Sequence, residues 1–151
     1  MNDHKFDWEN APALLVSVLE LINSLPADKA TTIPRLQELL GFPEHKLFVY
    51  GSLQPGRENH YMLSDLKGEW MKGYVTGDLI NYGWGAGMGY PAMVWNPDGN
   101  KINGQLLISN ELPNHWERLD ELEGKDYKRI LVPVICENQT QVAYIYSAFR
   151  P

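Results

Sequence analysis

The sequence predicts an α+β fold in which a curved or closed, barrel-like sheet is accompanied by few helices. Two segments with helical apolar spacing lie in the first 45 residues, and six short strand-like segments follow from Lys46 onward. Gly, Pro, Asn and Asp separate these strands, as is typical of barrel-like α+β domains. A chain of 151 residues is long enough for one domain with a small appendage. We therefore divide it into a helical N-terminal extension, residues 1–45, and a barrel domain, residues 46–151.

The N-terminal extension contains the two predicted helices. In residues 12–25, leucine, valine and isoleucine recur at helical spacing, and Pro26 follows the end of the pattern. Residues 33–41 have Pro34 in the first turn and end at Gly41. Two such short helices cannot bury a core by themselves, so we expect them to dock on the barrel.

The barrel domain alternates strands with turns. Its six predicted strands are residues 46–51, 73–83, 91–96, 102–109, 129–137 and 141–149. Pro133 lies inside the fifth strand, which indicates an edge or a bulge at that point. Two further helices are predicted, a short one in residues 58–66 and a longer one in residues 113–124.

Composition argues against several classes of partner. The net charge of −6 and the lack of a basic stripe argue against nucleic-acid binding. No apolar run approaches the roughly 20 residues needed to cross a bilayer, and the N-terminus lacks the layout of a signal peptide. The single cysteine, Cys136, fits a reducing compartment. We expect a cytoplasmic protein with no membrane or nucleic-acid partner.

No cofactor or metal is expected from the motifs. The glycine-rich stretch 83–89 has no G-x-G-x-x-G register and no βαβ context, so it is interpreted as a loop. The four histidines are scattered, and none pairs with another at metal-ligand spacing.

Glu123 is the most unusual residue of the predicted helix 113–124. At about 100° per residue, it falls between Trp116 and Leu119 on the apolar stripe, and Gly124 ends the helix. Burial and the negative end of the helix dipole would both raise the pKa of this carboxyl group, as suits a general acid or base. The alternative is that the last turn frays and Glu123 bends into solvent toward Lys125 or Arg129.

The stretch "VYGSLQPG", residues 49–56, ends the first predicted strand with small residues. It is either a plain turn or a bend whose backbone N–H groups can receive an anionic group. Whether this bend lies near Glu123 does not follow from the residues alone.

These segments resemble the γ-glutamylcyclotransferase-like family. "YGSLQPG" is similar to the family motif Y-G-[ST]-L-x-x-G, and "LDELEGKDYKR" to L-D-x-x-E-G…Y-x-R. "ENHYML", "GYPAMV", "INGQLL" and "AYIY" resemble further family segments, although Gln105 replaces the usual acid and Leu107 the usual aromatic residue. The resemblance runs from about Lys46 to Tyr146 and leaves the N-terminal extension unmatched.

The resemblance implies a small mixed β-barrel with flanking short helices. It also implies a cofactor-independent reaction in which the α-amine of a γ-glutamyl compound attacks its own γ-carbonyl, releasing 5-oxoproline and an amine or amino acid. By the same resemblance, Glu123 is the catalytic acid/base. The implied substrate-binding residues are Tyr50, Gly51, Ser52, Leu53, Tyr127 and Arg129. For Arg129 a structural ion pair at the barrel rim is the alternative.

A second function stays open. The same fold could serve as a non-catalytic module that binds a small metabolite or a protein, with the N-terminal extension as its interaction surface. The altered "INGQLL" strand and the unmatched extension keep that alternative open. Within the enzyme hypothesis, γ-glutamylamines and γ-glutamylated secondary products are a narrower choice of substrate.

Overall fold

The computed structural model describes residues 12–25, 34–51, 53–57, 59–80 and 92–148. Its α-helices are α1 (Pro12–Asn23), α3 (Pro34–Leu39) and α4 (Trp116–Glu123). Single 3₁₀ turns are η2 (Pro43–His45), η3 (His60–Met62) and η5 (Leu112–Asn114). The strands are β1 (Lys46–Val49), β2 (Glu69–Ile80), β3 (Ala92–Trp95), β4 (Asn100–Ile108), β5 (Tyr127–Cys136) and β6 (Gln139–Ala148).

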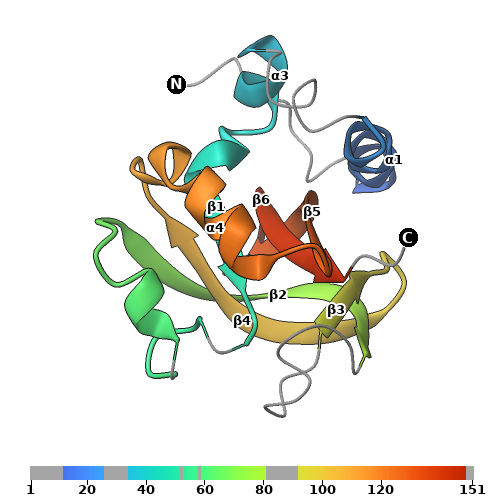
Figure 1. Ribbon diagram of the computed structural model, residues 1–151. Helices are drawn as coiled ribbons and strands as arrows, with labels where there is room; N and C mark the ends of the chain where they lie inside the picture. The colour runs from blue at the N-terminus through green and yellow to red at the C-terminus, as the bar shows by residue number, and fades with distance from the viewer. Residues whose placement is uncertain (1–11, 26–33, 52, 58, 81–91, 149–151) are drawn as a thin grey trace.

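The six strands form one sheet in the order β3-β2-β4-β1-β6-β5, and a β2–β5 pairing at Tyr74 and Ile135 closes it. The closed barrel therefore consists of β2, β4, β1, β6 and β5, while β3 pairs with the far end of β2 (Figure 1). β1 and β6 are parallel and the other pairs are antiparallel. The predicted small mixed barrel is confirmed.

A pair of glycines allows β2 and β4 to pass close to the strands beside them, β5 and β1. Gly73 and Gly104 lie directly across from each other in the β2–β4 register. A Cβ on Gly73 would lie 2.7 Å from the carbonyl oxygen of Ile135, and one on Gly104 would lie 2.3 Å from that of Val49. Any larger residue would push these strands apart, which is why glycine is needed at this point of closure.

The barrel strands bury side chains on both faces. The buried residues form two clusters, one around Phe48 and Val132, called here the barrel cluster, and one that includes residues of α1. On β6, Ala143 and Ile145 belong to the barrel cluster, while Tyr144 and Tyr146 belong to the other. The alternation follows from the period of two in a strand. Cys136 points into the barrel cluster, and burial raises the pKa of its thiol, as expected for an unreactive cysteine.

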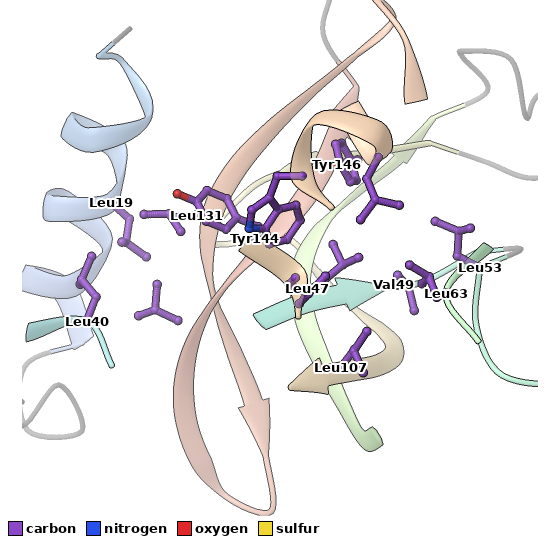
Figure 2. Packing of buried hydrophobic residues seen from close by; sticks show 14 of the residues in the cluster. Leu19, Leu40, Leu47, Val49, Leu53, Leu63, Leu107, Leu131, Tyr144 and Tyr146 are labelled. Atoms are coloured by element: carbon purple, nitrogen blue, oxygen red, sulfur yellow. The ribbon is translucent and has the colours of Figure 1, made fainter. Parts of the chain in front are cut away.

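The N-terminal extension shares its core with the barrel. Leu15, Leu19 and Ile22 of α1 join one cluster with Leu131 of β5 and with Tyr144. Figure 2 shows Leu19 and Leu40 facing the side of Leu131 and Tyr144, and α1 lies beside β5 in Figure 1. Docking of α1 on the barrel is therefore observed, and Leu40, directly after α3, joins the same cluster.

One asparagine fixes α1 to β5. The Asn23 side-chain amide donates from Nδ2 to the Leu131 carbonyl oxygen at 2.9 Å and accepts from the Leu131 N–H at 2.8 Å. The amide thus pairs with Leu131 as a neighbouring strand would. In addition, Lys128 Nζ donates to the Asn23 carbonyl oxygen at 2.9 Å, at the C-terminal end of α1.

The same edge explains Pro133. Alternate residues of a strand direct their N–H and C=O groups to the same edge. The Leu131 N–H bonds Asn23 on the edge of β5 that faces away from β6. The residue two positions later, Pro133, has no N–H, and the N–H of any other residue there would point to that same outer edge. The predicted edge position is confirmed, because no β6 hydrogen bond is lost.

Two sequence predictions differ from the structure. The helix expected in residues 58–66 is only the 3₁₀ turn η3, since the backbone bonds here join each N–H to the carbonyl three residues earlier, as from Leu63 to His60 and from Leu66 to Leu63. The second strand begins at Glu69 rather than Gly73, because pairing with β4 continues as far as Glu69 and Ile108. Within the described ranges, no helix is long and apolar enough to cross a membrane.

Candidate functional site

Glu123 lies on the buried face of α4. The buried residues of this helix are Trp116, Leu119 and Glu123, and Glu123 is only 9% exposed. Gly124 ends the helix at φ 80°, with its N–H bonded to the Asp120 carbonyl oxygen at 3.0 Å. The helix therefore continues through Glu123, and the alternative of a frayed last turn is wrong.

The bend after β1 is anchored by Tyr50. Its hydroxyl donates to the Tyr146 carbonyl oxygen at 3.1 Å and accepts the Met93 N–H at 3.0 Å. This phenol therefore joins the end of β1 to β3 and β6. Burial raises the pKa of Tyr50, so the hydroxyl stays protonated near neutral pH.

Gly51 and Leu53 continue the bend. None of the described residues places a heavy atom within 4 Å of a Cβ added to Gly51, so that side of the backbone is open among them. Leu53 is buried, and its carbonyl oxygen holds His60. Ser52 lies outside the described residues, as does the glycine-rich stretch 83–89.

The charge of Glu123 acts on the phenol of Tyr50, at the start of the bend. Burial is the main cause of the raised pKa of Tyr50, and the nearby charge of Glu123 raises it further. Glu123 also contributes to the raised pKa of Tyr146, whose larger causes are burial and the hydrogen bond to Asp120. The fold therefore places the carboxyl group at the end of α4 within electrostatic range of the phenol at the start of the bend.

Of the two roles considered for Arg129, substrate binding and a structural ion pair, the structure shows the ion pair. Its Nε and Nη2 lie 2.9 Å and 3.3 Å from the two carboxylate oxygens of Asp120. The guanidinium also lies 4.5 Å from the ring centroids of both Trp116 and Tyr144. These contacts hold the start of β5 against α4, the helix that carries Glu123.

Asp120 and Tyr146 are site neighbours that the sequence analysis did not single out. Tyr146 donates to an Asp120 oxygen at 2.7 Å, so this carboxylate accepts bonds from both Arg129 and Tyr146. The signal for Asp120 was present in the motif "LDELEG", three residues before Glu123. Tyr146 lies in the segment "AYIY", but its bond to Asp120 could not be predicted, because the two residues are 26 positions apart in the chain.

A cavity of about 480 Å³ on the barrel borders the same bend at Gln54, and its lining also includes Lys72, Tyr74, Gln105 and Glu137. Gln105, which replaces the acid usual in the family, therefore borders this cavity. Among the described residues, no group of three or more His, Cys, Asp or Glu side chains could hold a metal ion.

Comparison with known proteins supports the fold and the family. The model of the family described as "Gamma-glutamyl cyclotransferase, AIG2-like" matches residues 47–151. An AIG2-like protein from Mus musculus is similar in fold, with a TM-score of 0.56 and 16% identity over 71% of this chain and 80% of the mouse chain.

Two further solved structures share more of the sequence. YkqA from Bacillus subtilis has a TM-score of 0.54 and 28% identity over 69% of this chain, but only 35% of YkqA is covered. A protein from Arabidopsis thaliana has a TM-score of 0.52 and 27% identity over 70% of this chain and 69% of its own. No curated protein matches the chain. Because the family match runs through the whole barrel, from β1 onward, this chain belongs to the gamma-glutamyl cyclotransferase, AIG2-like family.

Proposed function

We propose that this protein is a γ-glutamyl cyclotransferase that converts a γ-glutamyl compound into 5-oxoproline and a free amine or amino acid. The observation that carries the proposal is the burial of Glu123, whose charge acts on the phenol of Tyr50 at the bend of the family motif. Family membership supports the class of reaction and a small γ-glutamyl substrate.

In the proposed reaction, both reacting groups belong to the same substrate molecule. The α-ammonium group gives a proton to the Glu123 carboxylate, and the resulting amine attacks the γ-carbonyl carbon to form the ring N–C bond. The original amide C–N bond then breaks. Overall, the ring nitrogen loses two protons and the leaving nitrogen gains two, with Glu123 carrying protons between them.

This chemistry places modest demands on the protein. Holding one rotamer of the substrate brings nucleophile and electrophile together, and such orientation is worth up to about 7–11 kcal/mol in favourable cases. The backbone amides of Gly51 and Leu53, together with Ser52, are proposed to bind the glutamyl group. Tyr127 is proposed to line the pocket. A raised pKa of Glu123 stays a prediction.

The roles of Tyr50 and Arg129 are narrower in this proposal. The hydroxyl of Tyr50 already bonds Tyr146 and Met93, so we propose that it positions the bend rather than binding the substrate through a free O–H. Arg129 is proposed to position α4 through Asp120. Cytoplasmic location, independence of cofactors and the division at residue 45 also stay predictions.

The test compares two glutamates of α4. Wild type, Glu123→Gln and Glu121→Gln are incubated with a panel of γ-glutamyl dipeptides and γ-glutamylamines, and 5-oxoproline is measured. Glu121 is exposed on the same helix, so its variant controls for loss of charge. We expect Glu123→Gln to lose at least about 100-fold in rate, as is typical of a lost general acid/base, and Glu121→Gln to retain activity. Equal turnover by Glu123→Gln and wild type would remove Glu123 from the mechanism.

Gly51→Val tests the other half of the site. Because its Cβ would enter open space, this variant should fold normally and yet obstruct the glutamyl group. Normal turnover by a folded Gly51→Val protein would place the substrate elsewhere. If folded wild type produces no 5-oxoproline from any compound of the panel, the non-catalytic binding function becomes the better hypothesis.

A further inference from the structure

A second cavity lies where the N-terminal extension meets the barrel. Its volume is about 310 Å³, and it is lined by Gln37, Glu44, Pro113, Trp116 and Arg129. Gln37 belongs to α3 and Glu44 to η2, whereas the other three come from the barrel domain. The family match begins at residue 47, so two of the five lining residues lie outside it.

Two polar atoms at this cavity have no hydrogen-bond partner. Gln37 Oε1 and Glu44 Oε2 are both enclosed and unpaired in the described part of the chain. Gln37 is only 7% exposed. A buried polar atom without a partner is costly, so such an atom calls for an explanation, and a bound water or ion is a common one.

Of the two charged side chains that line the cavity, Arg129 has a partner of opposite charge, whereas one oxygen of Glu44 has no partner in the described part of the chain. Arg129 is already neutralised by its two contacts with Asp120. The buried oxygen of Glu44 has no such partner. Among the described residues no donor reaches these two atoms, and because both are acceptors and one belongs to a carboxylate, a positively charged hydrogen-bond donor would suit them.

Glu44 is held in place by the barrel. Its backbone carbonyl oxygen accepts the indole N–H of Trp116 at 2.9 Å. Trp116 in turn packs edge to face on Tyr144, with ring centroids 5.2 Å apart, and lies under the Arg129 guanidinium. The indole contact fixes the backbone of Glu44 before any ligand arrives, which lowers the cost of binding.

We propose that this cavity is a binding site for the ammonium group of a small amine, with Glu44 Oε2 and Gln37 Oε1 accepting its N–H donors. The site is separate from the proposed catalytic function and does not depend on it. Its volume suits an amine of a few carbon atoms, whose apolar part would lie against Pro113 and Trp116.

The experiment uses the Trp116 indole N–H as a reporter, because that group bonds directly to Glu44. ¹⁵N-labelled full-length protein is titrated with n-butylammonium chloride, with n-butanol as a neutral probe of similar shape and with sodium chloride at equal ionic strength. The indole signal is assigned with Trp116→Phe. We expect a saturable shift of this signal with n-butylammonium and none with the other two.

Variants test the two acceptors. Glu44→Gln should weaken n-butylammonium binding at least tenfold, and Gln37→Met should weaken it measurably. Glu117→Gln, on the exposed face of α4, should bind as wild type does. Because Glu44→Gln and Gln37→Met remove or neutralise an unpaired group, neither should lower the melting temperature of the free protein.

The proposal is wrong if n-butylammonium gives no saturable shift, which would mean that only water fills the cavity. It is also wrong if n-butanol saturates the signal equally, or if folded Glu44→Gln binds n-butylammonium as wild type does. The comparison of probes on wild type decides the question even where a variant fails to fold.

Discussion

At the residue scale, Tyr50 shows how the barrel and the candidate site share one side chain. Its hydroxyl is the common point of β1, β3 and β6, through the Tyr146 carbonyl oxygen and the Met93 N–H. Glu123 acts on the same phenol electrostatically. A change at Tyr50 should therefore affect both stability and the site.

Tyr50→Phe should destabilise the protein by about 1–3 kcal/mol, because it leaves the Met93 N–H and the Tyr146 carbonyl oxygen without this partner. The matched control is Tyr61→Phe, which removes the same oxygen from a residue that is 67% exposed. Urea unfolding measures both. Equal midpoints for the two variants would show that the buried hydroxyl contributes nothing.

The buried tyrosines also predict how stability depends on pH. Burial raises the pKa of Tyr50, and burial with the Asp120 hydrogen bond raises the pKa of Tyr146. In the unfolded chain both titrate at about 10. Above that pH the unfolded state loses protons that the folded state keeps. The free energy of unfolding should therefore fall as pH rises, by at most about 1.4 kcal/mol per pH unit for each tyrosine.

The measurement is urea unfolding at about pH 9 and about pH 11. The double variant Tyr50→Phe/Tyr146→Phe should show a flatter decline than wild type, because it lacks both groups. Identical declines in the two proteins would contradict the assignment of this pH dependence to these tyrosines.

At the scale of elements, the attachment of α1 to β5 depends on the side-chain amide of Asn23, which makes the two backbone hydrogen bonds that a neighbouring strand would make. Asn23 pairs with both backbone groups of Leu131, on the edge of β5 that β6 does not cover. An exposed edge with unpaired backbone groups would invite association with another chain. Asn23 and the helix above it therefore cover that edge.

Asn23→Ala should destabilise the protein by about 1–3 kcal/mol and accelerate exchange of the Leu131 amide hydrogen, because both backbone groups lose their partner. Ser24→Ala is the control, since the Ser24 hydroxyl makes only an exposed bond within the helix. Hydrogen exchange followed by NMR measures the effect. Unchanged protection at Leu131 in the Asn23 variant would show that α1 does not depend on this pair.

At the scale of the whole molecule, the N-terminal extension and the barrel have one core. Leu19 has an exposure of 0% within the cluster that contains Leu131 and Tyr144, whereas Leu21 of the same helix is 67% exposed. We therefore expect the two parts to unfold together, although only the barrel matches the family.

Leu19→Ala should cost about 2–5 kcal/mol, and Leu21→Ala should change stability by no more than about 0.5 kcal/mol. Urea unfolding is followed by near-UV circular dichroism for the barrel aromatics and by far-UV signal for the helices. In Leu19→Ala both signals should move together to lower urea. A shift of the helical signal alone would show that the extension unfolds independently.

Much of the fold followed from local pattern. The spacing of Trp116, Leu119 and Glu123 placed a carboxyl group on the buried face of α4, because helical periodicity depends only on neighbours in the chain. The strand segments followed from composition in the same way. Their ends were less accurate, as at β2, because pairing with β4 decides where a strand stops.

The sequence by itself determined the order of the elements, the buried face of α4 and the small residues of the bend after β1. Only the tertiary structure decided that β5 closes on β2, that Asn23 pairs with Leu131 and that Gln37 and Glu44 face one cavity. Asn23 and Leu131 are 108 residues apart in the chain. Contacts of this kind depend on the register in which distant segments meet, and no local pattern of residues encodes that register.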